Sequence, residues 1–236
     1  TQANGIASSV IDYIGSVEAD DATLRAANVI ALWTRAQSLR TAIPLANFGA
    51  WRPLAQSARE QFGRASALCS ELSGLSGFTA ANDNLAAVIE VVCLELDAVC
   101  EPDAAEPAIA RLVTIVREGA ETAAGTGERK AWAAIALANT AKRFIGDEAK
   151  LRGLLEFASA ALRAHAVATS NWYFAHRHLQ LDAERRRSLI DRGCASRALD
   201  ATEARLVAGV LGQIPASREE AATYFDLYAP QEGVTP

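Results

Sequence analysis

The sequence of 236 residues contains no methionine, three histidines and four cysteines. Cys69, Cys93, Cys100 and Cys194 show no CxxC spacing. Residues 1–15 lack the cationic start and continuous apolar stretch of a secretory signal, so we expect reduced thiols and a cytoplasmic protein. Because a metal site would need nearly all the histidines together with carboxylates, the sequence predicts no metal and no other cofactor.

Familiar catalytic motifs are also missing. The chain has no Glu-x-x-His or His-Glu-x-x-His, which are typical of di-iron and zinc sites on helices. It has no Gly-x-Ser-x-Gly, GxxxxGK[ST] or GxGxxG either, which serve acyl transfer and nucleotide binding. These absences disfavour an enzyme, although catalysis by residues without a known motif stays open.

The chain has little positive charge and no long apolar run. Its formal net charge is −5, whereas nucleic-acid binding needs clustered positive charge, so nucleic acid is not an expected partner. The most apolar stretch, residues 85–100, is interrupted by Glu90, Glu95 and Asp97. A membrane span needs about 20 mostly apolar residues, so we expect a soluble protein without one.

Alanine is what the sequence has in excess, with 51 residues. Alanine is the strongest helix former, because its side chain loses no rotamer freedom in a helix. Seven prolines and 15 glycines stand mostly between stretches of helical periodicity, and alternating runs typical of strands are missing. The sequence therefore predicts an all-α fold.

Apolar spacing and capping residues predict about nine or ten helices in an irregular bundle. We expect a single domain, with a possible subdivision at Gly125-Thr126-Gly127 and a frayed tail at 230–236. Asp147 and Asn171 are expected to cap helices. Eight of the predicted helices cover approximately residues 3–17, 21–43, 53–72, 79–100, 128–145, 171–192, 200–214 and 217–228. The fifth predicted helix starts near Pro107 and includes residues 109–116, and the seventh starts at the Asp147 cap and includes residues 151–165.

Three of these helices carry patterns that predict their place in the bundle. Helix 79–100 is apolar over well over half of its circumference, and helix 128–145 holds a run of small residues at 131–138, so both are expected near the centre. Helix 3–17 carries one apolar stripe. The stripe consists of Ile6, Val10, Ile14 and Val17.

The segment 170–179 is locally unusual, because it holds three aromatic residues and two of the three histidines. One interpretation is a ligand pocket between the seventh and eighth helices, lined by Trp172 and Tyr173 and with His176 or His178 exchanging a proton near neutral pH. The other is an amphipathic helix whose aromatic side chains belong to the core. His176 and His178 are two residues apart, so a regular helix would not let them chelate one metal ion.

Two further polar residues lie on apolar seams. His165 continues a leucine row of the seventh helix, and Glu95 lies inside the apolar arc of helix 79–100. An isolated buried carboxylate is costly, so Glu95 must be paired, hydrogen-bonded or protonated. Pairing with one of the 20 arginines is the expected outcome, and a cavity acid that helps to bind a ligand is the alternative.

The leading functional hypothesis is a non-catalytic helical module for protein–protein interaction, such as an adaptor, accessory subunit or regulator. Its expected partner is another protein or a second copy of the chain. The alternative is an enzyme or binder of small molecules. Its candidate ligand-binding residues are His165, Trp172, Tyr173, His176, His178 and Glu95.

Overall fold

The computed structural model describes residues 2–16, 22–73, 79–118, 126–169, 171 and 173–181. Within these residues the fold is all-α, as predicted, and every element is helical. The predicted helices 200–214 and 217–228 and the tail 230–236 lie outside the described residues. The described elements are α1 (Gln2–Ser16), α2 (Ala22–Ala42), η1 (Ile43–Leu45), α3 (Phe48–Leu72), α4 (Thr79–Cys100), η2 (Pro102–Ala104), α5 (Ala105–Glu118), α6 (Thr126–Phe144), α7 (Glu148–Thr169) and a helical segment at 173–181.

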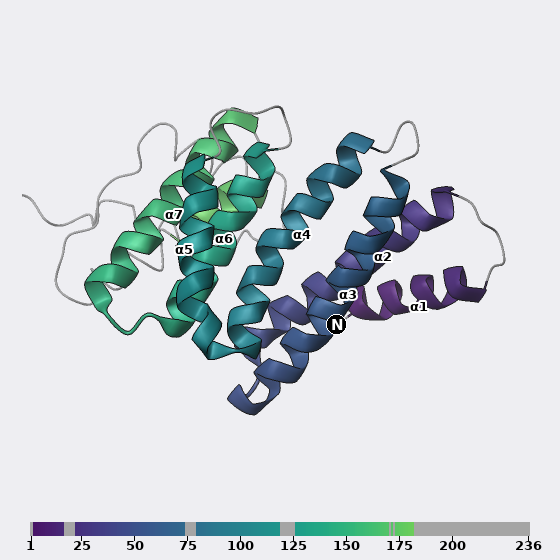
Figure 1. The fold of residues 1–236 in the computed structure, drawn as a ribbon, viewed down its shortest axis with the longest axis horizontal. Coiled ribbons are helices and arrows are strands. Elements are labelled where there is room, and N and C mark those ends of the chain that lie inside the picture. The colour runs from purple at the N-terminus through teal and green to yellow at the C-terminus, as the bar shows by residue number, and fades with distance from the viewer. Residues whose placement is uncertain are drawn as a thin grey trace, which may run out of the picture. The chain divides into compact units, whose positions relative to one another are not determined.

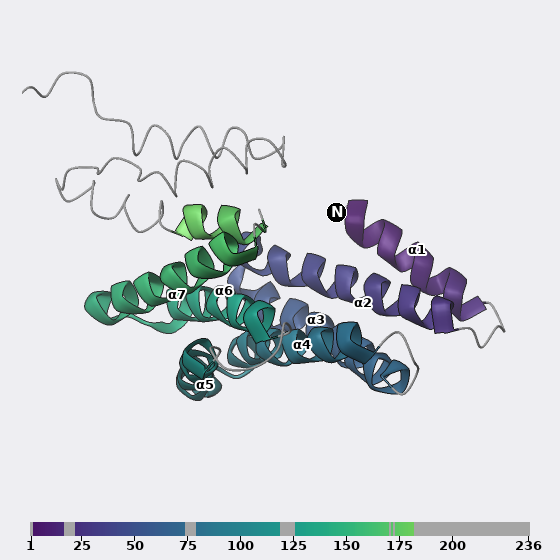
Figure 2. The same ribbon diagram turned by 90° about the horizontal axis from the view of Figure 1, so that it is seen from above.

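The chain divides into two compact units, Thr1–Ala136 and Leu137–Pro236. The boundary lies within α6, further along the chain than the glycine-containing segment suggested by the sequence. In unit 1 each helix packs on the next, so that α1 lies on α2, α2 on α3, α3 on α4 and α4 on α5 (Figure 1). Figure 2 shows α1 on the outer side of α2. The position of α1 at this edge leaves part of its surface uncovered.

The core of unit 1 consists of apolar rows with helical spacing. On α3, the residues that recur every three or four positions are buried, among them Ala58, Phe62, Ala65, Cys69 and Leu72. On α4, Glu90 is exposed, whereas Val88, Ile89, Val91 and Val92 beside it are buried. Residues 131–138 of α6 are all buried except the half-buried Trp132. The buried side chains of α4 and α6 agree with the apolar arc and the small-residue run found in the sequence.

An aromatic cluster joins three helices of unit 1. Trp33 of α2 meets Phe62 of α3 edge-on at 5.2 Å between ring centroids, and it meets Trp132 of α6 at 5.5 Å with perpendicular rings. Edge-to-face packing of this kind adds about 0.5–1.5 kcal/mol beyond the area that the rings bury. The cluster fixes the start of α6 against α2 and α3.

The predicted caps of the seventh and eighth helices are confirmed. The Asp147 carboxylate accepts a hydrogen bond of 2.7 Å from the Lys150 amide at the start of α7. The Asn171 side-chain oxygen accepts one of 3.1 Å from the Tyr173 amide, at the start of segment 173–181. Each bond satisfies one of the amides that a helix N-terminus leaves without a partner, which explains why the two helices begin there.

The predicted start of the third helix at Pro53 is wrong. Helix α3 begins at Phe48, after Asn47 in an extended conformation, and Pro53 lies inside the helix. Proline has no amide hydrogen, so it removes the bond to the carbonyl of Gly49. Because the lost bond is close to the N-terminus of a 25-residue helix, packing along the rest of α3 outweighs it.

Candidate functional site

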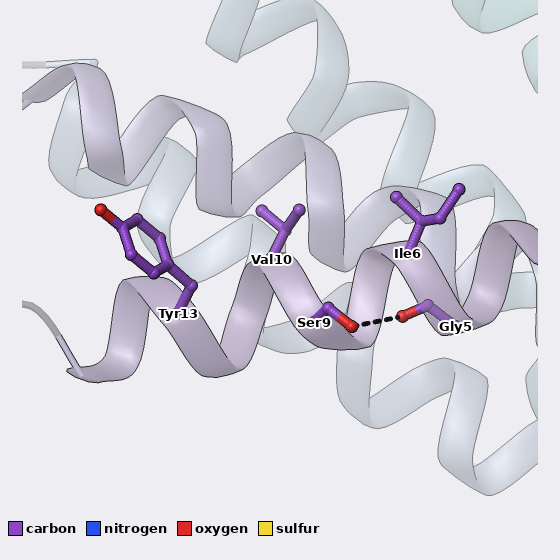
Figure 3. A pocket seen from close by; sticks show the side chains of 5 residues that line it. All are labelled: Gly5, Ile6, Ser9, Val10 and Tyr13. Carbon is purple, nitrogen blue, oxygen red and sulfur yellow. Dashed lines mark hydrogen bonds between the residues drawn. The ribbon is translucent and has the colours of Figure 1, made fainter.

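The exposed face of α1 is apolar. The buried residues of this helix are Ala7 and Ile11, so the stripe predicted from Ile6 and Val10 is not the face that α1 buries. Ile6 is 60% exposed and Tyr13 is 65% exposed, and Val10 is also exposed. Figure 3 shows these three side chains projecting from one side of the helix. They stand at positions i, i+4 and i+7, which places them along a single line on a helix surface.

Helix α2 continues this apolar surface. A groove of about 360 Å³ runs between the two helices, and Ile30 of α2 is 60% exposed beside it. Its floor includes Ala7 and Ala31, which are small and buried. The α2 side of the groove consists of Ala27, Ile30, Ala31 and Thr34. These are positions i, i+3, i+4 and i+7, the four residues that form a hole for an incoming side chain in helix–helix packing.

The groove carries no charged side chain. Asp12 is the only charged residue of α1, and it does not line the groove. The groove hydroxyl, that of Thr34, donates to the Ile30 carbonyl of its own helix at 2.8 Å, and the nearby Ser9 hydroxyl on α1 donates to the Gly5 carbonyl at 3.2 Å. Covering this surface would therefore leave few polar groups without a partner. Exposed apolar patches of this kind are typical of binding surfaces.

A second exposed apolar feature lies at the turn from α2 to α3. Leu45 and Phe48 are more than four-fifths exposed there. The Phe48 ring rests against Trp51 at 5.2 Å, and the Trp51 indole donates a 3.0 Å hydrogen bond to the Ala46 carbonyl. This corner has two exposed side chains and no groove residue, so it provides a matched control for the α1–α2 surface.

Glu95 lies in the core of unit 1 and is fully buried. Arg40 of α2 donates to the same carboxylate oxygen from two nitrogens, with an Nε–Oε2 distance of 3.0 Å. Arg40 is itself buried, donates to the Gln37 side chain at 3.2 Å and lies 5.9 Å from the Trp132 ring. The predicted pairing of Glu95 with an arginine is confirmed. The sequence could not identify which arginine, because Arg40 is 55 residues away.

The candidate residues of segment 170–179 belong to unit 2. His178 is buried, and its Nδ1 lies 2.9 Å from the Ser159 hydroxyl and 3.1 Å from the Ser159 carbonyl oxygen. Trp172 lies outside the described residues. Sequence reasoning missed Ser159, because a serine on the buried face of an alanine-rich helix gives no signal of its partner.

The other candidates of unit 2 surround Phe174. His165 meets this ring edge-on at 4.8 Å, and Tyr173 meets it at 5.3 Å. Tyr173 is exposed and His176 is half-buried. His165, Phe174 and Tyr173 therefore come together, whereas Glu95 belongs to the other unit. Ligand binding by these residues stays a prediction.

The environment of Cys93 on α4 suppresses its reactivity. Burial is the main cause that raises the pKa of this thiol to about 11, and the nearby Asp97 carboxylate raises it further. Asp97 is in turn bound to Arg59 at 2.7 Å. Because the thiolate is the reactive form of cysteine, such a thiol is a poor nucleophile near neutral pH.

Among the residues that the structure describes, no three or more histidine, cysteine or acidic side chains are grouped as metal ligands. None of the helices described is both long and apolar enough to cross a membrane. Comparison of the chain with protein-family models, curated proteins and solved structures finds no match. The α1–α2 groove is therefore the feature from which a function can best be argued.

Proposed function

We propose that this chain is a non-catalytic helical module for protein–protein interaction, acting as an adaptor, accessory subunit or regulator. One observation carries the proposal: the uncharged apolar groove between α1 and α2, with Ile6, Tyr13 and Ile30 exposed beside it. In an isolated chain these side chains would stay in contact with water at a cost of about 25 cal/mol per Å² of apolar surface. Burial against a partner removes that cost.

The shape of the groove suits a helix. Two adjacent helices with a floor of small residues leave a channel in which a third helix can lie, with one apolar residue per turn in contact. The hole formed by Ala27, Ile30, Ala31 and Thr34 receives one such side chain. The proposed ligand is therefore an amphipathic helix with an uncharged apolar face.

The proposal is tested by comparing variants as bait in affinity capture from the native host. Ile30→Glu places a charge at the groove without removing a buried contact, since this side chain is largely exposed. Phe48→Glu is the matched control, because it changes another largely exposed apolar residue, 81% against 60% exposed, outside the groove. We expect Ile30→Glu to lose at least one protein that both the parent chain and Phe48→Glu retain.

Each protein lost in this way would then be purified and titrated against the three baits. A direct complex that Ile30→Glu weakens at least tenfold supports the proposal. Identical binding by all three chains would rule out the groove as the interaction surface.

A further inference from the structure

We infer that the turn between α2 and α3 is a second docking surface, which inserts Leu45 and Phe48 into an apolar pocket with a basic rim on a protein partner. This surface is separate from the α1–α2 groove, so either proposal can fail alone. The inference follows from the exposure of the two side chains, from the contacts that hold the turn, from its projection past α4 and from the acidic charge beside it.

Leu45 and Phe48 are the most exposed large apolar side chains of the described residues, at 88% and 81%. Ile43, two residues before Leu45, is fully buried. The chain therefore passes from the core to an apolar tip in water within a few residues. Aromatic and aliphatic side chains of this kind gain most when a pocket on a partner removes them from water.

The turn is held in one conformation by its own contacts. Residues Ile43–Leu45 form a 3-10 turn with Pro44 near its start, and the Ala46 amide donates to the Ile43 carbonyl at 3.2 Å. The Trp51 indole donates to the Ala46 carbonyl at 3.0 Å, and the Phe48 ring rests against Trp51 at 5.2 Å. Side chains that are fixed before binding lose less freedom in a complex, which suits them as anchors.

The turn projects past the neighbouring helix. Arg59 of α3 binds Asp97 of the adjacent helix α4 at 2.7 Å. Phe48 lies 11 residues before Arg59, about 16 Å of helix, whereas α4 ends at Cys100, three residues after Asp97. Helix α3 thus extends about 12 Å past the end of α4, and Figure 1 shows the turn beyond that end. A projecting apolar tip fits into a pocket.

The end of α4 and the start of α5 are acidic. Glu101, Asp103 and Glu106 are exposed there, and Arg52 is exposed nearby. Burial raises the pKa of the Cys100 thiol, and Arg52 and Glu101 are both close enough to act on it, Arg52 lowering and Glu101 raising it. A typical interface covers about 800 Å² per partner, a disc of about 16 Å radius, which reaches from Phe48 to these charges. Lysine or arginine at the rim of the pocket would complement them.

A lipid surface is the other place into which a projecting apolar turn inserts. Leu45 and Phe48 together offer less apolar surface than one myristoyl chain, which alone holds a protein on a membrane only weakly. The acidic side chains beside the turn are also repelled by anionic lipids. Both observations favour a protein partner over a lipid surface.

The experiment begins with affinity capture from the native host, with the parent chain, Phe48→Ala and the groove variant Ile30→Glu as baits. Each protein that only Phe48→Ala loses is purified and titrated against the full chain by calorimetry, at about 50 mM and about 300 mM salt. We expect Phe48→Ala to weaken the direct complex at least tenfold and Ile30→Glu to leave it unchanged. Urea denaturation should show that Phe48→Ala keeps its fold, because the side chain is largely in water.

Glu101→Lys tests the basic rim of the pocket. It should weaken the same complex at least about threefold at the lower salt concentration and less at the higher one, where charges are screened. Glu118→Lys is the matched control, because Glu118 is also exposed but lies at the other end of α5. In flotation with vesicles of phosphatidylcholine and phosphatidylserine at about 4:1, the parent chain should stay unbound.

A direct complex that Phe48→Ala and Glu101→Lys weaken, and that neither Ile30→Glu nor Glu118→Lys weakens, supports the inference. Finding no such complex, or equal effects of Glu101→Lys and Glu118→Lys, overturns it. Binding of the parent chain to the vesicles that Phe48→Ala abolishes also overturns it and assigns the turn to a lipid surface. The proposed groove survives each of these results, because its test depends on the loss caused by Ile30→Glu.

Discussion

Helices α1 and α4 are both rich in apolar residues, yet the apolar side chains of α1 are much more exposed to water than those of α4. Helix α4 exposes none of its described apolar side chains and fully buries a carboxylate, that of Glu95. Helix α1 leaves Ile6, Val10 and Tyr13 in water. The difference comes from position, because α4 packs between α3 and α5 whereas α1 packs along α2 at the edge of unit 1. Apolar composition therefore does not by itself tell which face of a helix is covered.

The largest effect is expected for Glu95→Gln on α4. This substitution leaves Arg40 buried without its counter-charge, so the free energy of unfolding should fall by about 3–5 kcal/mol in urea denaturation. Glu90→Gln on the exposed face of the same helix is the control. Glu90 binds Arg129 at 2.8 Å in contact with solvent, so its loss should cost less than about 1 kcal/mol. Equal losses in the two variants would contradict the role given to burial.

Truncating one isoleucine on each helix tests the comparison directly. Ile89 of α4 is buried, so Ile89→Ala should lower the free energy of unfolding by about 2–5 kcal/mol through lost contacts and a cavity. Ile6→Ala on α1 should change it by no more than about 0.5 kcal/mol, because the side chain is already largely in water. Both variants should be measured at the same low protein concentration. A cost for Ile6→Ala close to that for Ile89→Ala would show that Ile6 is covered within the folded chain.

The alkylation rate of the Cys93 thiol is a second measure of burial on α4. With a pKa of about 11 against an ordinary value of 9.0, it holds about 100-fold less thiolate near neutral pH, which corresponds to about 2.7 kcal/mol. Its alkylation by iodoacetamide, followed by peptide mass spectrometry, should be slower than in the urea-unfolded chain by a similar factor. Because the thiolate reacts, the folded-state rate should rise about tenfold per pH unit up to about pH 11. A rate that levels off below pH 9 would contradict the raised pKa.

The smallest of these effects concerns the buried polar contact of unit 2. Ser159→Ala removes the hydroxyl beside His178 but leaves the Ser159 carbonyl, which is 3.1 Å from the same ring nitrogen. Since that nitrogen keeps a partner, the cost should be about 1 kcal/mol. His178→Ala should cost more, because it also empties a buried space. Thermal unfolding of both variants would rank them, and the reverse order would show that the hydroxyl is the main contact.

Local chemistry is what the sequence predicted best. The bounds of α4, the caps at Asp147 and Asn171 and the buried run of α6 depend on residues close together in the chain, and all agree with the structure. The need to neutralise Glu95 was also predictable, because burial of a lone charge is costly wherever it occurs. Its partner was not, since any arginine met the same requirement.

The start of α3 and the exposed face of α1 were harder to predict for a related reason. Proline at a first helical turn is the commoner arrangement, but tertiary packing extends α3 back to Phe48. On α1 the stripe of larger residues looked like the inner face, whereas the smaller Ala7 approaches α2 closely enough to be buried. Which of two apolar faces is covered depends on the neighbouring helix, and one sequence read locally does not contain that information.

The contact between Arg40 and Glu95 also restricts how this sequence can change over generations. Loss of either residue alone leaves a charge in the core without its counter-charge, so each single replacement gives a protein of low stability. Replacing both with apolar side chains of similar volume restores a compatible interior. Positions 40 and 95 should therefore vary together among descendants of this chain, although 55 residues separate them.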